Sequence, residues 1–280
     1  MEIAKFDSVD ETRFNNVTWV AEIPSTNTAL LERARNGGQE GEVIVADLQT
    51  QGRGRRGREW TAPAGTSLMM SMLLRPSSDA LSPNNASLTT SALALSARTA
   101  ILELTNIHLE IKWPNDLVID TPIDQLLDPD PGYRKVAGIL TETLISDAAI
   151  EAVVIGIGLN TGWGEVPPEL QSVATSLDVL AKSAIDRNAV AFKILQNFET
   201  EYTALLTPHG SQQLLHKVRK HSNTLGKQVQ VHMGATPKSQ IIRGRAVDLD
   251  ECGRLIVETD NNDSRVISTG DVEHLRLDAR

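Results

Sequence analysis

The sequence of 280 residues is poor in cysteine and in aromatic residues, and it has no long apolar run. Its one cysteine, Cys252, excludes an intrachain disulfide and any metal site built from several cysteines. No stretch approaches the roughly 18 consecutive apolar residues that a membrane-spanning helix needs. The first residues are polar and contain no apolar signal segment. We therefore expect a cytoplasmic protein that does not use a membrane as a partner.

Basic residues are outnumbered by acidic ones, 27 to 36, so the formal net charge is −9. A dedicated nucleic-acid binder usually carries a basic domain, so this balance speaks against nucleic acid as a partner. The exception is the stretch 51–60, Q-G-R-G-R-R-G-R-E-W, where four arginines alternate with three glycines before a tryptophan. Such a run is typical of a nucleic-acid arm, a localisation tag or a loop that holds phosphate.

The remaining composition, 40% hydrophobic and 22% charged, is typical of a globular protein. Apolar periodicity and turn signals predict helices over 25–36, 84–104, 188–206 and 211–221. The same signals predict strands over 42–50, 66–76, 135–145 and 150–162, and two strands within 108–120 around a Trp-Pro-Asn-Asp turn.

From about residue 226 the sequence turns to short alternating runs, which predict a small all-β domain. We place the two domains at 1–223 and 224–280. The segment 120–133 is rich in proline and aspartate and is expected to form an exposed, mobile loop. A stretch from Asp248 begins like a calcium loop, but its closing position falls on Thr259, so a β-hairpin turn is the better interpretation.

The Gly-Arg run suits a small anion. Glycine lets backbone N–H groups approach a phosphate closely, and arginine offers planar donors that match phosphate and carboxylate. Trp60 lies two residues beyond the last arginine, where it could stack on a base. On spacing alone, a solvated basic loop explains the run equally well.

Other polar residues interrupt apolar strands. Lys112 precedes Asn115 and Asp116, Lys135 opens one strand and Asn160 ends another. Each residue alone is explained by a strand edge or a turn. For each residue alone these explanations are favoured, and any functional signal lies in the set as a whole.

The motifs together resemble those of biotin protein ligases, in the same order and over roughly residues 20–165. They are S-T-N (25–27), Q-T-Q-G-R-G-R-R-G-R-E-W (49–60), K-W-P-N-D (112–116), K-V-A-G-I-L (135–140) and G-I-G-L-N (156–160). The resemblance implies an α/β (α+β) fold, with a mixed β-sheet flanked by helices as in class II aminoacyl-tRNA synthetases. It also implies a small SH3-like all-β barrel at the C-terminus.

The resemblance further implies a reaction in two steps. Biotin and ATP, with Mg²⁺, give biotinyl-5′-AMP, and the biotinyl group then passes to a lysine of a biotin carboxyl carrier domain of acyl-CoA carboxylases. Lys135, Arg55 and Asp116 are the expected catalytic residues. Asp116 would orient or deprotonate the incoming lysine. The loop from Gly52 to Arg58 is expected to be mobile and to order over the adenylate.

Binding residues are carried over position by position. The expected biotin-binding residues are Ser25, Thr26, Asn27, Gln49, Gly52, Arg53, Arg55, Lys135 and Gly138. The expected ATP- or adenylate-binding residues are Arg53, Arg55, Arg56, Arg58, Trp60, Lys112, Asn115, Lys135 and Asn160. Several acidic residues are available to Mg²⁺, and the sequence does not single out its ligands.

The S-T-N motif starts at residue 25, which leaves no room before it for the winged-helix domain that some members of the family use to repress transcription. We therefore expect the ligase-only type, without a nucleic-acid partner, as a monomer or weak homodimer. Two alternatives remain open at this stage. One is a lipoate ligase of the same fold, and the other is an Arg-Gly module that binds RNA.

Overall fold

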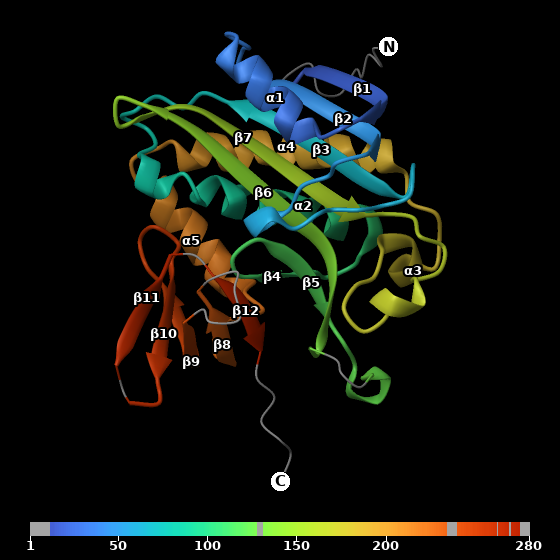
Figure 1. Cartoon of the computed structure of the whole chain (residues 1–280), viewed down its shortest axis with the longest axis vertical. Helices are drawn as coiled ribbons and strands as arrows, with labels where there is room; N and C mark the ends of the chain where they lie inside the picture. Colours follow the sequence, from blue (N-terminus) through green and yellow to red (C-terminus); the bar gives the residue numbers. More distant parts are fainter. Residues whose placement is uncertain (1–11, 128–130, 234–239, 262, 269, 275–280) are drawn as a thin grey trace.

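The computed structural model describes residues 12–127, 131–233, 240–261, 263–268 and 270–274. Its centre is a mixed seven-stranded sheet in which β1 and β2 are parallel and the other neighbours are antiparallel (Figure 1). In spatial order the strands are β1 (Asn16–Ile23), β2 (Glu42–Gln49), β3 (Ser67–Leu74), β7 (Ala149–Asn160), β6 (Tyr133–Ser146), β5 (Asp116–Asp120) and β4 (Glu110–Lys112). The predicted mixed sheet is therefore confirmed.

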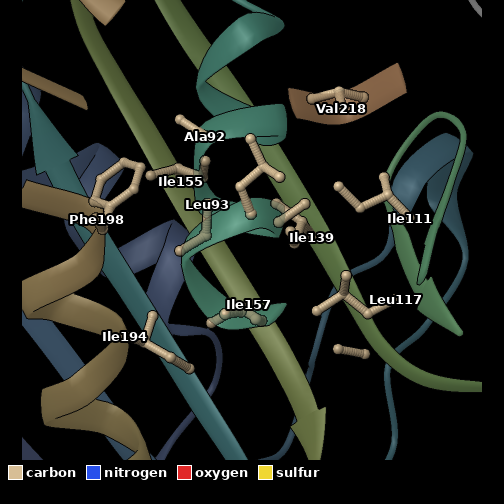
Figure 2. Close-up of a cluster of buried hydrophobic side chains, with 14 of the residues drawn as sticks. Ala92, Leu93, Ile111, Leu117, Ile139, Ile155, Ile157, Ile194, Phe198 and Val218 are labelled. Carbon is tan, nitrogen blue, oxygen red and sulfur yellow. The ribbon is translucent and has the colours of Figure 1, made fainter. Parts of the chain in front are cut away.

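Helices cover both faces of this sheet. Helix α1 (Thr26–Arg35) packs against β2, β3 and β7, and the side chain of Ser25 caps its N-terminus. Helices α2 (Leu88–Thr105) and α4 (Arg187–Leu205) pack on each other and on the opposite face. Figure 2 shows how apolar side chains from α2, α4 and the strands interlock in this core. With both faces covered, β3 is buried along its whole length.

The C-terminal part forms a second, antiparallel sheet of five strands (Figure 1). In spatial order these strands are β11 (Ser264–Ile267), β10 (Leu255–Thr259), β9 (Ile241–Leu249), β8 (Gln228–His232) and β12 (Asp271–His274). Helix α5 (Gly210–Lys220) contacts both α2 and β9. The Trp113 indole Nε1 donates to the Gly253 carbonyl at 3.0 Å, and buried residues of both sheets form one core. This packing brings β12 to the edge of the main domain's cavity.

Most predicted elements are confirmed, with small differences at their ends. The predictions missed β1, α3 (Leu177–Ala181) and β12. Strand β1 shows no clean alternation of buried and exposed residues, so it gives no period-2 signal. Of the predicted loop, Ile123–Gln125 forms a short 3-10 turn and 128–130 lie outside the described residues. No helix in the described ranges is long and apolar enough to cross a membrane.

Candidate active site

A cavity of about 690 Å³ opens between the main sheet, the Gly-Arg loop and strand β12. Such a volume suits a small-molecule ligand. Most residues predicted for the site line this cavity: Ser25, Thr26, Asn27, Gln49, Arg53, Arg55, Arg58, Trp60, Lys112, Asn115, Asp116, Lys135 and Gly138. The fold therefore gathers side chains from segments that lie more than a hundred residues apart in the chain.

Three predicted residues lie outside the cavity lining. At Gly52 a side chain would collide with the Trp60 carbonyl, so this glycine lets the base of the loop close. Arg56 turns toward the C-terminal sheet. Asn160 is buried, and its Nδ2 donates to the Thr175 carbonyl at 3.1 Å. Ligand contacts of these three residues stay predictions.

Glycines make one wall of the cavity flat. Gly138 and Gly158 lie opposite each other on β6 and β7, and the Trp60 ring lies directly against both. A Cβ at Gly158 would stand only 2.4 Å from Trp60 Cε2. The Trp60 indole Nε1 is buried, with no hydrogen-bond partner among the described residues. The backbone glycines thus provide the space in which Trp60 sits.

We predict that Gly158→Ala pushes Trp60 out of place and raises the KM for ATP. Overpacking at a tight site costs typically 1–3 kcal/mol, which corresponds to a rise in KM of roughly fivefold to 150-fold. Pyrophosphate release measured at varied ATP concentrations checks this. Gly162→Ala is the matched control, because its Cβ would meet nothing within 4 Å. Equal KM values for the two variants would contradict the prediction.

At one end of the cavity, hydroxyl and amide groups form a continuous chain. Gln49 Oε1 accepts from the Thr26 backbone N at 2.7 Å and contacts Thr26 Oγ1 at 3.0 Å. Thr26 Oγ1 lies 2.6 Å from Ser71 Oγ, which in turn donates to Asn27 Oδ1 at 2.6 Å. Ser71 was not among the predicted residues, because a serine within the apolar strand 66–76 gives no signal of its own.

At the other end, a carboxylate pairs with one lysine and has a second lysine nearby. Lys135 Nζ stands 2.7 Å from Asp116 Oδ1. Lys112 is buried, and burial lowers the pKa of its ammonium group. Burial also acts to raise the pKa of Asp116, but Lys135 and Lys112 outweigh burial and hold it below its usual range. Arg55 also interacts electrostatically with Asp116, so basic side chains outnumber the carboxylate at this end, which favours an anion.

The first half of the Gly-Arg loop is tied to the main domain. The Arg53 guanidinium forms a two-pronged pair with Glu142, at 2.9 and 3.1 Å. Arg55 Nη1 donates to Asn115 Oδ1 at 3.1 Å. Burial lowers the pKa of Arg55 from its ordinary value, although nearby carboxylates offset part of this effect. Arg55 is therefore held beside the lysines.

The second half of the loop is tied to the C-terminal sheet. Arg56 Nη1 donates to the His232 carbonyl at 3.0 Å and pairs with Asp271 at 3.1 Å, and Arg58 pairs with the same carboxylate. Asp271, Glu273 and His274 also line the cavity. These β12 residues were missed, since nothing in the sequence of that strand distinguishes it.

His274 is an inward-facing group of β12. Its Nε2 is buried, with no hydrogen-bond partner among the described residues, and its ring lies edge-on to Tyr133 with centroids 5.0 Å apart. Burial, helped by the positive charge of Lys112, lowers the pKa of His274 from 6.5 to about 3. The imidazole is therefore neutral in the folded protein at neutral pH.

We predict that this histidine makes the protein less stable in mild acid. The unfolded chain binds a proton at His274 below about pH 6.5, whereas the folded chain does not until about pH 3. The contribution of His274 to the free energy of unfolding is therefore complete above pH 6.5. It falls as the pH drops toward 3, with a slope that approaches roughly 1.4 kcal/mol per pH unit. Denaturant unfolding of the parent and His274→Gln at pH 7.5, 6 and 5 checks this. Parallel pH curves for the two proteins would contradict it.

No cluster of three or more His, Cys, Asp or Glu side chains in the described part of the chain could hold a metal alone. Mg²⁺ at nucleotide sites usually binds through substrate phosphates, water and one or two carboxylates. Glu59, Asp271 and Glu273 line the cavity and could supply such a carboxylate. The residues present therefore fit a Mg²⁺ ion that arrives with a nucleotide.

The chain is similar to known ligases over most of its length. Residues 19–160 match the model of the biotin/lipoate A/B protein ligase family, and residues 224–275 match the biotin protein ligase C terminal domain. The biotin–[acetyl-CoA-carboxylase] ligase of Mycobacterium tuberculosis is 34% identical over 259 residues, covering 92% of this chain and 88% of that protein. The bifunctional ligase/repressor BirA of Bacillus subtilis is 35% identical, covering 90% of this chain and 71% of that protein.

A solved structure agrees in fold as well. The biotin protein ligase from Aquifex aeolicus in complex with biotin and ATP superposes with a TM-score of 0.71 at 27% identity, covering 94% of this chain and 100% of that chain. The family models thus match segments of both sheets, and the C-terminal match is specific to biotin protein ligases. The chain therefore belongs to the biotin/lipoate A/B protein ligase family and, within it, to the biotin protein ligases.

Proposed function

We propose that this protein is an ATP-dependent ligase that activates biotin as biotinyl-5′-AMP and transfers the biotinyl group to a lysine of a biotin carboxyl carrier domain. The names of its relatives support a carboxylase as the source of that domain. The observation that carries the proposal is the cavity itself, which has an uncharged, acceptor-rich end and a positively charged end.

The uncharged end favours a ligand with N–H donors. Three close contacts join Gln49, Thr26, Ser71 and Asn27, but the two hydroxyl groups supply only two protons for them. One of the three contacts therefore lacks a proton, and an N–H group of a ligand could supply one to the oxygen atoms at this end. A ureido ring carries N–H donors, whereas the dithiolane ring of lipoate carries none. Biotin therefore fits this end better than lipoate does.

The charged end suits the first step. A carboxylate oxygen of biotin attacks the α-phosphorus of ATP and pyrophosphate leaves, so two anions have to approach each other. Lys135 and Arg55 offset their repulsion and stabilise the charge that develops on the phosphate. Mg²⁺, when bound with the nucleotide, neutralises phosphate charge. The Gly-Arg loop over the cavity would keep water from hydrolysing the adenylate.

In the second step the ε-amine of the carrier lysine attacks the acyl carbon, AMP leaves and the amine loses a proton. The lowered pKa makes Asp116 an ionised but weak base at neutral pH. Its charge and position beside Lys135 favour orientation of the incoming amine over its deprotonation. Trp60 stays our proposed partner for the adenine ring, by stacking.

Adenylate formation with biotin or lipoate as the only acid tests the choice of substrate. We expect biotin to release pyrophosphate from ATP and lipoate to do so far more slowly. Equal rates would move the proposal to a lipoate ligase. If neither biotin nor lipoate forms an adenylate, and the protein binds RNA at physiological salt, an RNA-binding module would be favoured instead.

The remaining parts of the proposal concern partners and organisation. We propose a cytoplasmic enzyme, monomeric or weakly dimeric, with domains at 1–223 and 224–280; the two sheets fall on either side of that boundary. The net charge of −9 supports the absence of a nucleic-acid partner. Specific gel-shift binding to biotin operon DNA at physiological salt would contradict that part.

A further inference from the structure

Glu142 on β6 is the residue that joins the uncharged end of the cavity to the Gly-Arg loop. Its Oε2 accepts from Asn27 Nδ2 at 3.1 Å and from Arg53 Nη1 at 3.1 Å. Its Oε1 stands 2.9 Å from Arg53 Nη2. Glu142 itself is not among the residues that line the cavity. Whatever it contributes to the reaction therefore acts through Asn27 and Arg53.

The carboxylate of Glu142 fixes the orientation of the Asn27 amide. An ionised carboxylate only accepts hydrogen bonds, and so does the Leu140 carbonyl, which also receives Asn27 Nδ2 at 3.3 Å. A reversed amide would place Asn27 Oδ1 against two acceptors. Asn27 Oδ1 must therefore face Ser71, as the 2.6 Å contact between them shows.

This orientation sets the direction in which the hydroxyl groups of Ser71 and Thr26 donate. Because Asn27 presents an acceptor, the Ser71 hydroxyl donates its proton to Asn27 Oδ1. Thr26 must then donate to Ser71 across their 2.6 Å contact. In this order the 3.0 Å contact of Thr26 Oγ1 with Gln49 Oε1 has no proton, and Gln49 Oε1 keeps only the Thr26 backbone N–H. The lone pairs of Thr26 and Gln49 are thus left to a donor from the ligand.

We propose that Glu142 is a positioning residue that fixes the direction of these hydrogen bonds, so that the cavity selects a ligand with N–H donors. Glu142 also links this hydrogen-bond network to Arg53. The inference rests on the proposed activity toward biotin. The pair with Arg53 is partly exposed, with side-chain exposures of 47% for Arg53 and 22% for Glu142. Such pairs stabilise a fold little, so the effect of Glu142 falls on binding rather than on folding.

Glu142→Gln separates this role from a structural one. A glutamine offers either an oxygen or an N–H to Asn27, so both amide orientations become possible and the proton order is lost. We expect the KM for biotin to rise about tenfold, the equivalent of one or two hydrogen bonds, with a smaller change in kcat. We also expect discrimination against biotin methylated at a ureido nitrogen to weaken about tenfold, measured as the ratio of kcat/KM values.

Two further variants complete the test. Glu142→Asp keeps an acceptor-only carboxylate and should retain the discrimination even if its KM rises. Glu151→Gln, an exposed glutamate on the neighbouring β7, is the matched control. An unchanged discrimination ratio in Glu142→Gln, or an equal loss in the Gln and Asp variants, would overturn the inference. If the parent protein forms no adenylate with biotin, the proposed function fails first, which is a distinguishable outcome.

Discussion

Replacing Lys135 by alanine is expected to slow formation of biotinyl-5′-AMP by about 10²–10³-fold, the usual loss when one preorganised donor to developing charge is removed. Lys135 is the lysine closest to Asp116, and its Nζ also lies 5.4 Å from the centre of the Trp60 ring. Under the proposed function, this is the place where the acid, the phosphate and the adenine meet. Pyrophosphate release with biotin and ATP alone measures this step without the carrier domain.

The fold should survive this substitution, because Asp116 keeps Lys112 as a counter-charge. Lys193→Ala is the matched control. This lysine pairs with Glu103 on the helical face at 2.9 Å, away from the cavity. An adenylation rate in Lys135→Ala equal to that of the Lys193 variant would remove Lys135 from the catalytic group.

Asp116→Asn is expected to damage both stability and transfer. It breaks the ion pair with Lys135 and removes the nearby negative charge from the buried Lys112, so the melting temperature should fall. Transfer should fall further than adenylation, since the carrier lysine also loses its anion. Thermal unfolding measures the first effect, and single-turnover transfer from preformed biotinyl-5′-AMP measures the second.

Asp263→Asn serves as the control, because that aspartate is exposed and only loosely paired with Arg265 at 3.9 Å. If Asp116→Asn unfolds at the same temperature as this control, the folded protein does not need Asp116 to compensate the charges of Lys112 and Lys135. If transfer then proceeds at the parent rate, Asp116 has no role in the second step.

The sequence predicted much of the site because its residues sit in short, unusual motifs. An arginine-glycine run and polar residues that interrupt apolar strands are visible without a structure. Lys112, Asp116 and Lys135 form one charged group because β5 pairs with both β4 and β6. That pairing follows from the fold, and the motif order only implied it through the resemblance.

Other parts of the site left no readable signal. Glu142 looks like one more polar residue on a long strand, and its importance comes from two partners that lie more than 80 residues away. Strand β12 reaches the cavity only because the second sheet packs on Trp113 and α5. Gly158 was visible in the G-I-G-L-N motif, but its contact with Trp60 was not. Such contacts are tertiary, and local patterns do not encode them.

Mass spectrometry of a biotin carboxyl carrier domain, incubated with this protein, biotin and ATP, tests the proposed function most directly. The proposal predicts a gain of one biotinyl group on one lysine, with no gain when ATP is omitted or when lipoate replaces biotin. A carrier domain that stays unmodified, under conditions where a known biotin protein ligase modifies it fully, would contradict the proposed function.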